Sequence, residues 1–142
     1  MSTYVVNAKS AEGFHVDVTA RNHHFVVDQP EAAGGNNEGP NPLEYNVASL
    51  AACMITIGNI IKKQEHLKVE GMDVKVEADV DPAILMGKAE GHPGFSEVRI
   101  FMKVTAPEMT EAEIEDFVNR IEQRCPVSDN LKVVTPVKLI IE

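Results

Sequence analysis

The stretch of residues 41–65, NPLEYNVASLAACMITIGNIIKKQE, decides the fold. Asn41 is a good helix N-cap, Pro42 suits the first helical position, and Glu44 lies three residues after the cap. This spacing predicts a helix over Pro42–Glu65, about 35 Å long at 1.5 Å per residue. Its many β-branched residues lower its intrinsic propensity, so packing has to stabilise it.

Apolar residues lie around most of the circumference of this helix. One long stripe consists of Leu43, Val47, Leu50, Met54, Ile57 and Ile61. A second set widens the apolar surface on both sides of this stripe and consists of Tyr45, Ala48, Ala52, Ile55 and Ile60. A helix that is apolar all round is buried on all sides, whereas one sheet covers only one side of it. We therefore expect a homodimer that shares this helix near its core. The alternative is that a second helix of the same chain covers the remaining face.

The segments on both sides of the helix have the two-residue period of strands. We expect strands at residues 3–8, 14–19 and 24–28 before the helix, and at 67–80, 98–105 and 133–141 after it. A second helix should begin after Thr110, because Glu113 completes a capping box and an apolar stripe follows. The order βββ-α-ββ-α-β predicts an α+β fold in a single domain of residues 1–142.

Composition and charge exclude several classes of protein. The chain has 142 residues, of which 44% are hydrophobic, and its 13 Lys and Arg against 22 Asp and Glu give a net charge of −9. That charge repels a phosphate backbone, so nucleic acid is not an expected partner. The N-terminus lacks the pattern of a secretion signal, and the apolar run of residues 47–61 is shorter than the roughly 20 residues that cross a bilayer. We expect a soluble cytoplasmic protein with no membrane partner.

The two cysteines are the only candidates for chemistry that the residues themselves supply. Cys53 lies midway along the long helix and Cys125 follows the second helix. Free cysteine is among the most buried residue types, so both are either inert core residues or reactive thiols. The five histidines show no metal-ligand spacing, and no phosphate-binding glycine loop is present. The sequence therefore predicts no metal and no cofactor.

Two motifs carry a resemblance to a known family. The first is Gly39-Pro40-Asn41-Pro42-Leu43-Glu44 continuing to Ala51-Ala52-Cys53, and the second is Cys125-Pro126-Val127-Ser128. Together they resemble the OsmC/Ohr family of thiol peroxidases, which reduce organic hydroperoxides. The resemblance implies an OsmC-like intertwined homodimer. In it, the long central helices pack together between sheets and the active sites lie at the subunit interface.

The resemblance also implies roles for the cysteines. Cys53 matches the family's peroxide-attacking cysteine and Cys125 its resolving cysteine. The implied cycle begins with an organic hydroperoxide, passes through a Cys53 sulfenic acid and a Cys53–Cys125 disulfide, and ends with an external dithiol of the lipoyl or thioredoxin type. This cycle requires no metal, haem or flavin.

A thiolate is the nucleophile in such a cycle, so Cys53 needs a nearby cation. It lies eleven residues past Pro42, too far along the helix for the dipole at the N-terminus to act on it. The family uses an arginine held by a glutamate, and Arg21 and Glu44 are the residues that match best.

Both assignments leave alternatives open. Glu44 lies nine residues before Cys53 and points to the opposite side of the helix, so it either acts on the other subunit's site or only caps the helix start. Arg21 equally fits an exposed strand residue, and Arg124 could act on the adjacent Cys125 instead.

A second function remains open on the same fold. The chain could be a non-catalytic protein that keeps both cysteines as packing residues and binds an apolar ligand at the dimer interface. The apolar loop residues 84–86 either cover the site or anchor a small part of the core.

Overall fold

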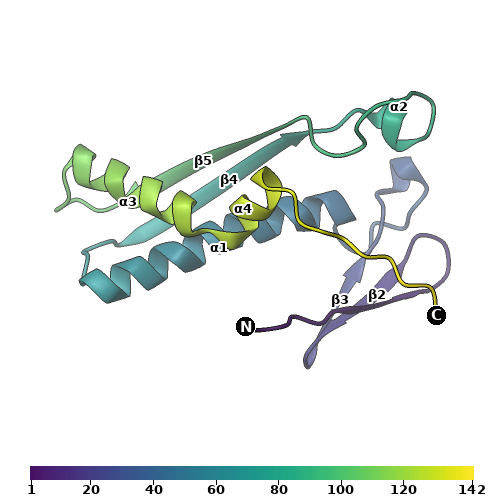
Figure 1. Ribbon diagram of the computed structural model, residues 1–142, viewed down its shortest axis with the longest axis horizontal. Coiled ribbons are helices and arrows are strands. Elements are labelled where there is room, and N and C mark those ends of the chain that lie inside the picture. The colour runs from purple at the N-terminus through teal and green to yellow at the C-terminus, as the bar shows by residue number, and fades with distance from the viewer. The chain divides into compact units, whose positions relative to one another are not determined.

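The computed structural model describes residues 1–142 as two compact units, residues 1–46 and residues 47–142. We call them the N-terminal unit and the C-terminal unit and describe each by itself. Strands precede the long helix and further strands follow it, so the predicted α+β class is confirmed (Figure 1).

The N-terminal unit contains a three-stranded antiparallel sheet. Its strands are β1 (Asn7–Ser10), β2 (Val16–Ala20) and β3 (His23–Val27), hydrogen-bonded in that order. Asn7 lies opposite Thr19, and Val16 lies opposite Val27. All three predicted strands are present, but β1 begins at Asn7 rather than at residue 3.

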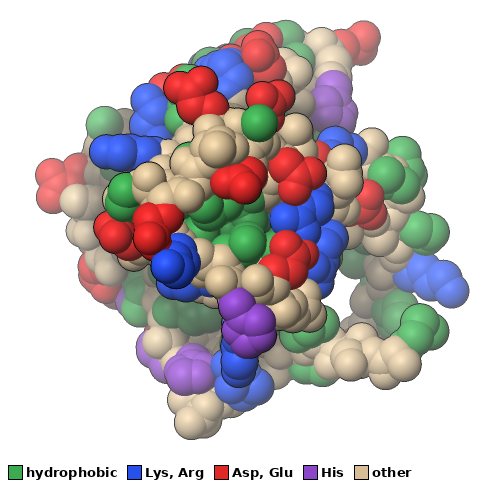
Figure 2. Space-filling model, turned by 90° about the vertical axis from the view of Figure 1, so that its left-hand side faces the viewer, with side chains coloured by type: hydrophobic (Ala, Val, Ile, Leu, Met, Phe, Trp, Pro, Cys, Tyr) green, Lys and Arg blue, Asp and Glu red, His purple; other side chains and the backbone are tan.

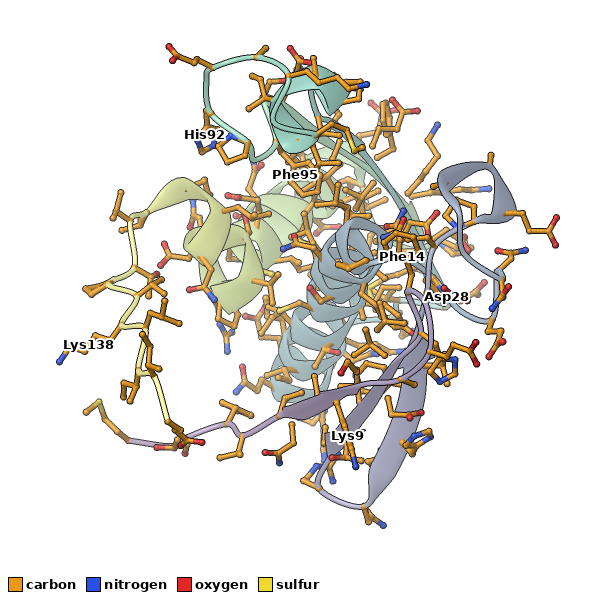
Figure 3. The ribbon with its side chains drawn as sticks, turned by 90° about the vertical axis from the view of Figure 1, so that its right-hand side faces the viewer. Lys9, Phe14, Asp28, His92, Phe95 and Lys138 are labelled. Atoms are coloured by element: carbon orange, nitrogen blue, oxygen red, sulfur yellow. The ribbon has the colours of Figure 1, made fainter.

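A buried carboxylate holds the loop that follows β3. Asp28 is only 1% exposed and accepts the backbone N–H groups of Gln29, Asn36 and Glu38 at 2.7, 3.1 and 3.2 Å. These hydrogen bonds keep the pKa of Asp28 below its usual range, with the Gln29 N–H as the largest cause. The loop, which includes the 3₁₀ helix η1 (Glu31–Ala33), is therefore folded around this side chain (Figure 3).

A histidine ties the same loop to the sheet. The Nε2 atom of His15 lies 3.1 Å from Asp17 Oδ1, and its Nδ1 atom lies 2.8 Å from Glu38 Oε2. His24 also approaches Asp17, at 3.3 Å. A neutral imidazole has a single N–H, so only the protonated ring donates to both carboxylates. Hydrogen bonding to Asp17 and Glu38 accordingly raises the pKa of His15.

The long helix α1 (Pro42–Glu65) has the predicted bounds. Its start is closed by a capping box in which Asn41 Oδ1 accepts the Glu44 N–H at 2.9 Å and Glu44 Oε2 accepts the Asn41 N–H at 2.8 Å. The first turn also joins the interior of the N-terminal unit, because the Tyr45 hydroxyl donates to the Val26 carbonyl oxygen at 2.8 Å.

The C-terminal unit packs helices against an antiparallel ribbon. Strand β4 (Gly71–Asp79) pairs with β5 (Glu97–Thr105), and the helices α3 (Glu111–Arg124) and α4 (Pro126–Lys132) follow. The ribbon runs along α1, with α3 beside them (Figure 1). The buried core joins these elements through Leu50, Met54, Ile61, Val69, Ala106, Phe117, Ile121 and Cys125.

The sequence predicted the two ends of α3 well. Thr110 caps the helix, its hydroxyl accepts the Glu113 N–H at 3.2 Å, and the Glu113 carboxylate accepts the Thr110 N–H at 2.8 Å. Two short helices were not predicted: α2 (Pro82–Leu85) lies in the expected loop between β4 and β5, and α4 follows Cys125.

The predicted closing strand at residues 133–141 is wrong for the single chain. The structure gives these residues no regular secondary structure, and the apolar ones are exposed. A strand requires a neighbouring strand to satisfy its backbone N–H and C=O groups, and this chain offers residues 133–141 no paired neighbour.

Much of α1 remains uncovered within the chain. Its buried residues are Leu50, Met54, Gly58 and Ile61, while Ile60 is 39% exposed. Helix α3 therefore covers only one side of α1. By length and composition alone α1 could also cross a membrane, a test that core helices of soluble proteins pass as well.

Candidate functional site

Cys53 lies on α1 and is partly exposed. Its side chain packs against the apolar core cluster of the C-terminal unit. It lies one residue before the fully buried Met54, so the helix places the thiol at the edge of the core rather than in its centre. The residue is therefore partly buried and partly exposed.

Cys125 lies at the corner where α3 ends and α4 begins. It is the C-cap of α3 and the N-cap of α4, and its Sγ accepts the Ser128 N–H at 3.4 Å. The residue is 1% exposed and belongs to the core cluster. Pro126 follows as the first residue of α4, where its missing N–H is no loss.

The fold brings the two thiols together. The Cys53 thiol is a hydrogen-bonding neighbour of the Cys125 thiol, and both cysteines are free. Burial, followed by the interaction with Cys53, raises the pKa of Cys125, and the N–H groups of Ser128 and Val127 offset only part of this rise. The two thiols thus interact within apolar surroundings, and Cys53 is the less buried of the two.

A polar network fastens α4 to α3 beside Cys125. Glu122 Oε1 accepts the Ser128 hydroxyl at 2.7 Å and pairs with the Lys132 ammonium group. Lys132 and Ser128 lower the pKa of Glu122, so it is ionised at neutral pH. No sequence motif marks Glu122, although its place three residues before Cys125 puts it within one turn of the corner.

The arginines of the C-terminal unit are engaged away from the thiols. Arg99 pairs with Asp79 and Glu77 on the outer face of the ribbon, and Arg120 pairs with Glu65 and Asp116. The Arg124 guanidinium donates to Gln64 Oε1 at 3.2 Å. The alternative in which Arg124 acts on Cys125 therefore has no contact to support it.

The remaining predicted site residues lie in the N-terminal unit. Arg21 is exposed in the turn between β2 and β3, with a positive φ of 55°. Glu44 is exposed on the first turn of α1, and its carboxylate accepts the Asn41 N–H. The capping interpretation of Glu44 is thus realised in the structure.

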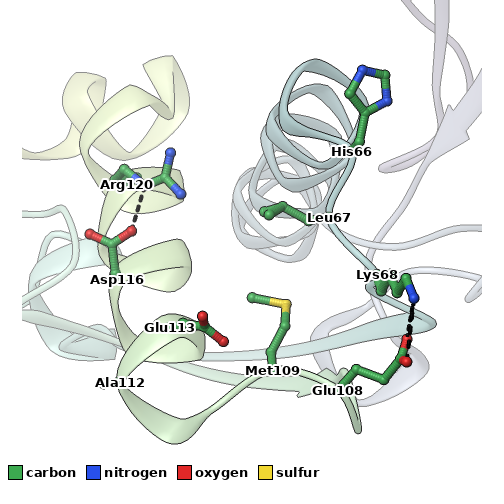
Figure 4. Close-up of a pocket in the computed structure, with 9 residues that line it drawn as sticks. All are labelled: His66, Leu67, Lys68, Glu108, Met109, Ala112, Glu113, Asp116 and Arg120. Atoms are coloured by element: carbon green, nitrogen blue, oxygen red, sulfur yellow. Dashed lines mark hydrogen bonds and ion pairs between the residues drawn. The ribbon is translucent and has the colours of Figure 1, made fainter.

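A separate pocket lies at the other end of α1. Its volume is about 490 Å³, and its walls combine the apolar Leu67, Met109 and Ala112 with charged residues (Figures 2 and 4). The charges pair with one another, Lys68 with Glu108 and Arg120 with Asp116. Cys53 lies twelve residues before the end of α1, about 18 Å along the helix axis, so this pocket does not belong to the thiols.

The loop between β4 and β5 does not anchor the core. Leu85 and Met86 are exposed, and Ile84 is half-buried near Gly91. Of the two interpretations of residues 84–86, the core anchor is therefore wrong, and a cover over the site remains a prediction.

Comparison with known proteins agrees with the fold and the motifs. The model of the family described as OsmC-like protein matches residues 35–140. The organic hydroperoxide resistance protein of Xanthomonas axonopodis pv. citri is 30% identical over 99 residues, which cover 70% of this chain and 64% of that protein. The chain therefore spans less than two thirds of the length of this relative.

Two comparisons with Mycoplasma pneumoniae extend over most of the chain. A hydroperoxide reductase is 22% identical over 122 residues, covering 86% of this chain and 83% of the relative. The crystal structure of an OsmC-like protein superposes with a TM-score of 0.79 at 20% identity, covering 94% of this chain and 89% of the other. Because the family model matches residues 35–140, about three quarters of its length, this chain belongs to the OsmC-like family.

Proposed function

We propose that the protein is a cysteine-based peroxidase that reduces organic hydroperoxides to alcohols. The observation that carries this proposal is the pairing of Cys53, partly exposed, with Cys125, buried, inside an apolar cluster. The names of its relatives, organic hydroperoxide resistance protein and hydroperoxide reductase, support the same class of activity. We place the protein in the cytoplasm, where reduced thiols are maintained.

The proposed cycle has three balanced steps. The Cys53 thiolate attacks the O–O bond and becomes a sulfenic acid, while the alkoxide leaves and takes up a proton to form the alcohol. The Cys125 sulfur then attacks the Cys53 sulfur, forming the disulfide and releasing water. An external dithiol of the lipoyl or thioredoxin type finally supplies two electrons and restores both thiols.

Thiol counting tests this cycle directly. One equivalent of cumene hydroperoxide should remove two free thiols per chain from the wild-type protein and none from the Cys53→Ser variant. The matched Cys125→Ser variant should lose one thiol, and dimedone should trap its Cys53 sulfenic acid. A wild-type protein that keeps both thiols for hours would contradict the proposed activity.

We further propose that the working form is a homodimer. Its support is the uncovered face of α1, including Ile60, and the exposed apolar residues of the C-terminal segment. Contiguous apolar surface left in water marks a site of protein–protein contact. Sedimentation should give about twice the chain mass of 15.5 kDa, and Ile60→Asp should shift the mass toward the single chain. A wild-type mass of one chain at micromolar concentration would contradict the dimer.

The cation that ionises Cys53 is assigned to Arg21. Arg99, Arg120 and Arg124 have other partners, which leaves Arg21 as the remaining arginine of the chain. Arg21→Gln should slow hydroperoxide reduction roughly 100-fold, as loss of a charge-stabilising donor does elsewhere, and should move Cys53 alkylation to higher pH. The control Arg99→Gln removes a cation from the outer face of the ribbon and should leave both unchanged.

Glu44 is assigned the support of that arginine, and one substitution separates this role from capping. Gln also serves as the third residue of a capping box, so Glu44→Gln should preserve stability. A loss of activity without a loss of stability would support the charge role. Unchanged activity would reduce Glu44 to a helix cap.

The second candidate, a protein that binds an apolar ligand at the dimer interface, is favoured by the same exposed apolar surface. It predicts that hydroperoxide removes no thiols and that Cys53→Ser binds an apolar fluorescent probe as the wild type does. Displacement of the probe by hydroperoxide without turnover would favour this candidate over the peroxidase.

A further inference from the structure

The two sulfurs of the pair are unequally accessible. Cys53 is partly exposed, whereas Cys125 is 1% exposed and lies beneath the corner of α3 and α4. Thiol–disulfide exchange needs the attacking thiolate to reach a sulfur along the line of the S–S bond. In a disulfide between these two residues, Cys125 is sealed by its own chain whereas Cys53 is not, so Cys53 is the sulfur that an external thiol can reach.

The corner that covers Cys125 is fixed at both ends of α4. The Glu122 carboxylate accepts the Ser128 hydroxyl at 2.7 Å and pairs with Lys132, the last residue of α4. Ser128 is itself 5% exposed. Glu122 therefore ties both Ser128 and Lys132 of α4 to α3, next to the buried Cys125.

The same corner supplies a hydrogen-bond donor that stabilises negative charge on the Cys125 sulfur. The Ser128 N–H points at Cys125 Sγ from 3.4 Å, and the Val127 N–H also acts on it. A leaving thiolate is stabilised by N–H donors, and a better leaving group leaves faster. When an external thiolate cleaves the disulfide, Cys125 is therefore the better leaving group and Cys53 the sulfur that is attacked.

We propose that the regenerating dithiol attacks Cys53 and never Cys125, and that Glu122 is the positioning residue that enforces this choice by holding α4 closed. The inference rests on the proposed function and specifies its last step. The first thiolate of the dithiol bonds to Cys53 Sγ, the S–S bond breaks, and its electron pair goes to Cys125 Sγ, which then takes up a proton. The second thiolate attacks the mixed disulfide, releases the Cys53 thiolate and leaves the dithiol as a cyclic disulfide.

The site of attack is measured on the whole protein. The disulfide is made with diamide, so the experiment does not depend on peroxidase activity. Brief reaction with cysteamine, acid quenching and peptic digestion at low pH then locate the mixed disulfide by mass spectrometry. We expect at least about tenfold more cysteamine on the Cys53 peptide than on the Cys125 peptide, because reactivity follows access. Equal labelling, or labelling mainly on Cys125, would overturn the proposal.

The positioning role of Glu122 is tested by the same ratio. Glu122→Ala removes both bonds to α4 and should bring the labelling of the two peptides to within about threefold of each other. Glu115→Ala is the matched control, since Glu115 lies two turns earlier on the same face of α3 and is exposed. It should retain the wild-type ratio. If Glu122→Ala keeps the wild-type ratio of Cys53 to Cys125 labelling, Glu122 does not position α4 as proposed.

A milder variant covers the case in which Glu122→Ala does not fold. Lys132→Met cuts only the ion pair and should give a ratio between those of the wild type and Glu122→Ala. The outcomes also separate this inference from the proposed function. Loss of two thiols with hydroperoxide but labelling of Cys125 overturns the regeneration step alone, whereas diamide disulfide with labelling of Cys53 but no reaction with hydroperoxide overturns the peroxidase alone.

Discussion

The two units of the chain hold their interiors together in different ways. The N-terminal unit buries Val18 and Asp28, and the contacts that order it are hydrogen bonds and charges around Asp28 and His15. The C-terminal unit instead buries a continuous apolar cluster, in which Cys125 is one of eight members. The thiol chemistry that we propose belongs to the unit whose interior excludes water. Arg21 and Glu44 lie in the N-terminal unit, where the titratable side chains of His15 and Asp28 make the hydrogen bonds described above.

The largest difference should appear when an aromatic side chain is removed from each unit. Phe117 is fully buried in the C-terminal core, whereas Phe14 is 55% exposed and lies against Gly34. Phe117→Ala should lower the free energy of unfolding by about 3–5 kcal/mol through cavity formation. Phe14→Ala should cost about 0.5 kcal/mol, as surface changes do. Urea denaturation measures both, and equal losses would contradict the contrast.

Removal of the buried charge should open the loop of the N-terminal unit. Asp28→Asn replaces one acceptor oxygen by an NH₂ group that faces backbone donors, so at least one of the three N–H bonds is lost. Amide exchange at Asn36 and Glu38 should rise at least about tenfold, while amides of β4 and β5 stay protected. Unchanged exchange at Asn36 would show that the loop is ordered by other contacts.

The two capping boxes permit a comparison of like with like. Asn41→Ala removes the cap of α1 and Thr110→Ala that of α3, and each should cost about 1 kcal/mol of unfolding free energy. Equal losses would show that a helix cap contributes alike in both units. A much larger loss for Asn41→Ala would show that the N-terminal unit depends on the start of α1.

The smallest effect is the dependence of the N-terminal unit on pH. The raised pKa of His15 means that its contribution is fully present below pH about 6.5 and is lost as the pH rises through the folded value. The lowered pKa values of Asp17 and Asp28 mean that their contributions are present above about pH 3.8 and are lost as the pH falls through their folded values. Stability should therefore decline on both sides of a plateau.

Tyrosine fluorescence reports this plateau selectively. The chain has no Trp, and both Tyr residues lie in the N-terminal unit, where Tyr45 packs against Phe25. His15→Gln should abolish the alkaline decline and keep the acid one, because Gln has no charge to lose. An alkaline decline that survives in His15→Gln would assign it to another group.

Local signals predicted most of the fold but not the pairing of the two thiols. Asn41, Glu44 and Thr110 marked helix starts through side-chain hydrogen bonds that need no tertiary structure, and the structure has both boxes. Pro126 follows the second predicted helix, but proline is also common at the first position of a helix, and here it begins α4. Asp81 before Pro82 is the same signal in α2.

Other features have no local signal. The strand pattern of residues 133–141 is real, but pairing depends on a neighbour that the pattern cannot specify. The burial of Asp28 depends on backbone groups up to ten residues later, which no periodicity indicates. The proximity of Cys53 and Cys125 was implied by family resemblance alone, and the structure supplies its physical cause in the packing of α1 against the corner of α3 and α4.

A sulfur that caps a helix connects oxidation to the backbone. The N-cap of a helix is usually a side-chain oxygen, but in α4 it is Cys125 Sγ. A change in the charge of this sulfur therefore changes the strength of its hydrogen bond to the first turn of α4. A thiolate attracts the Ser128 N–H, and a sulfur in a disulfide attracts it less. Oxidation of Cys125 therefore changes the hydrogen bond that caps α4 as well as the thiol itself.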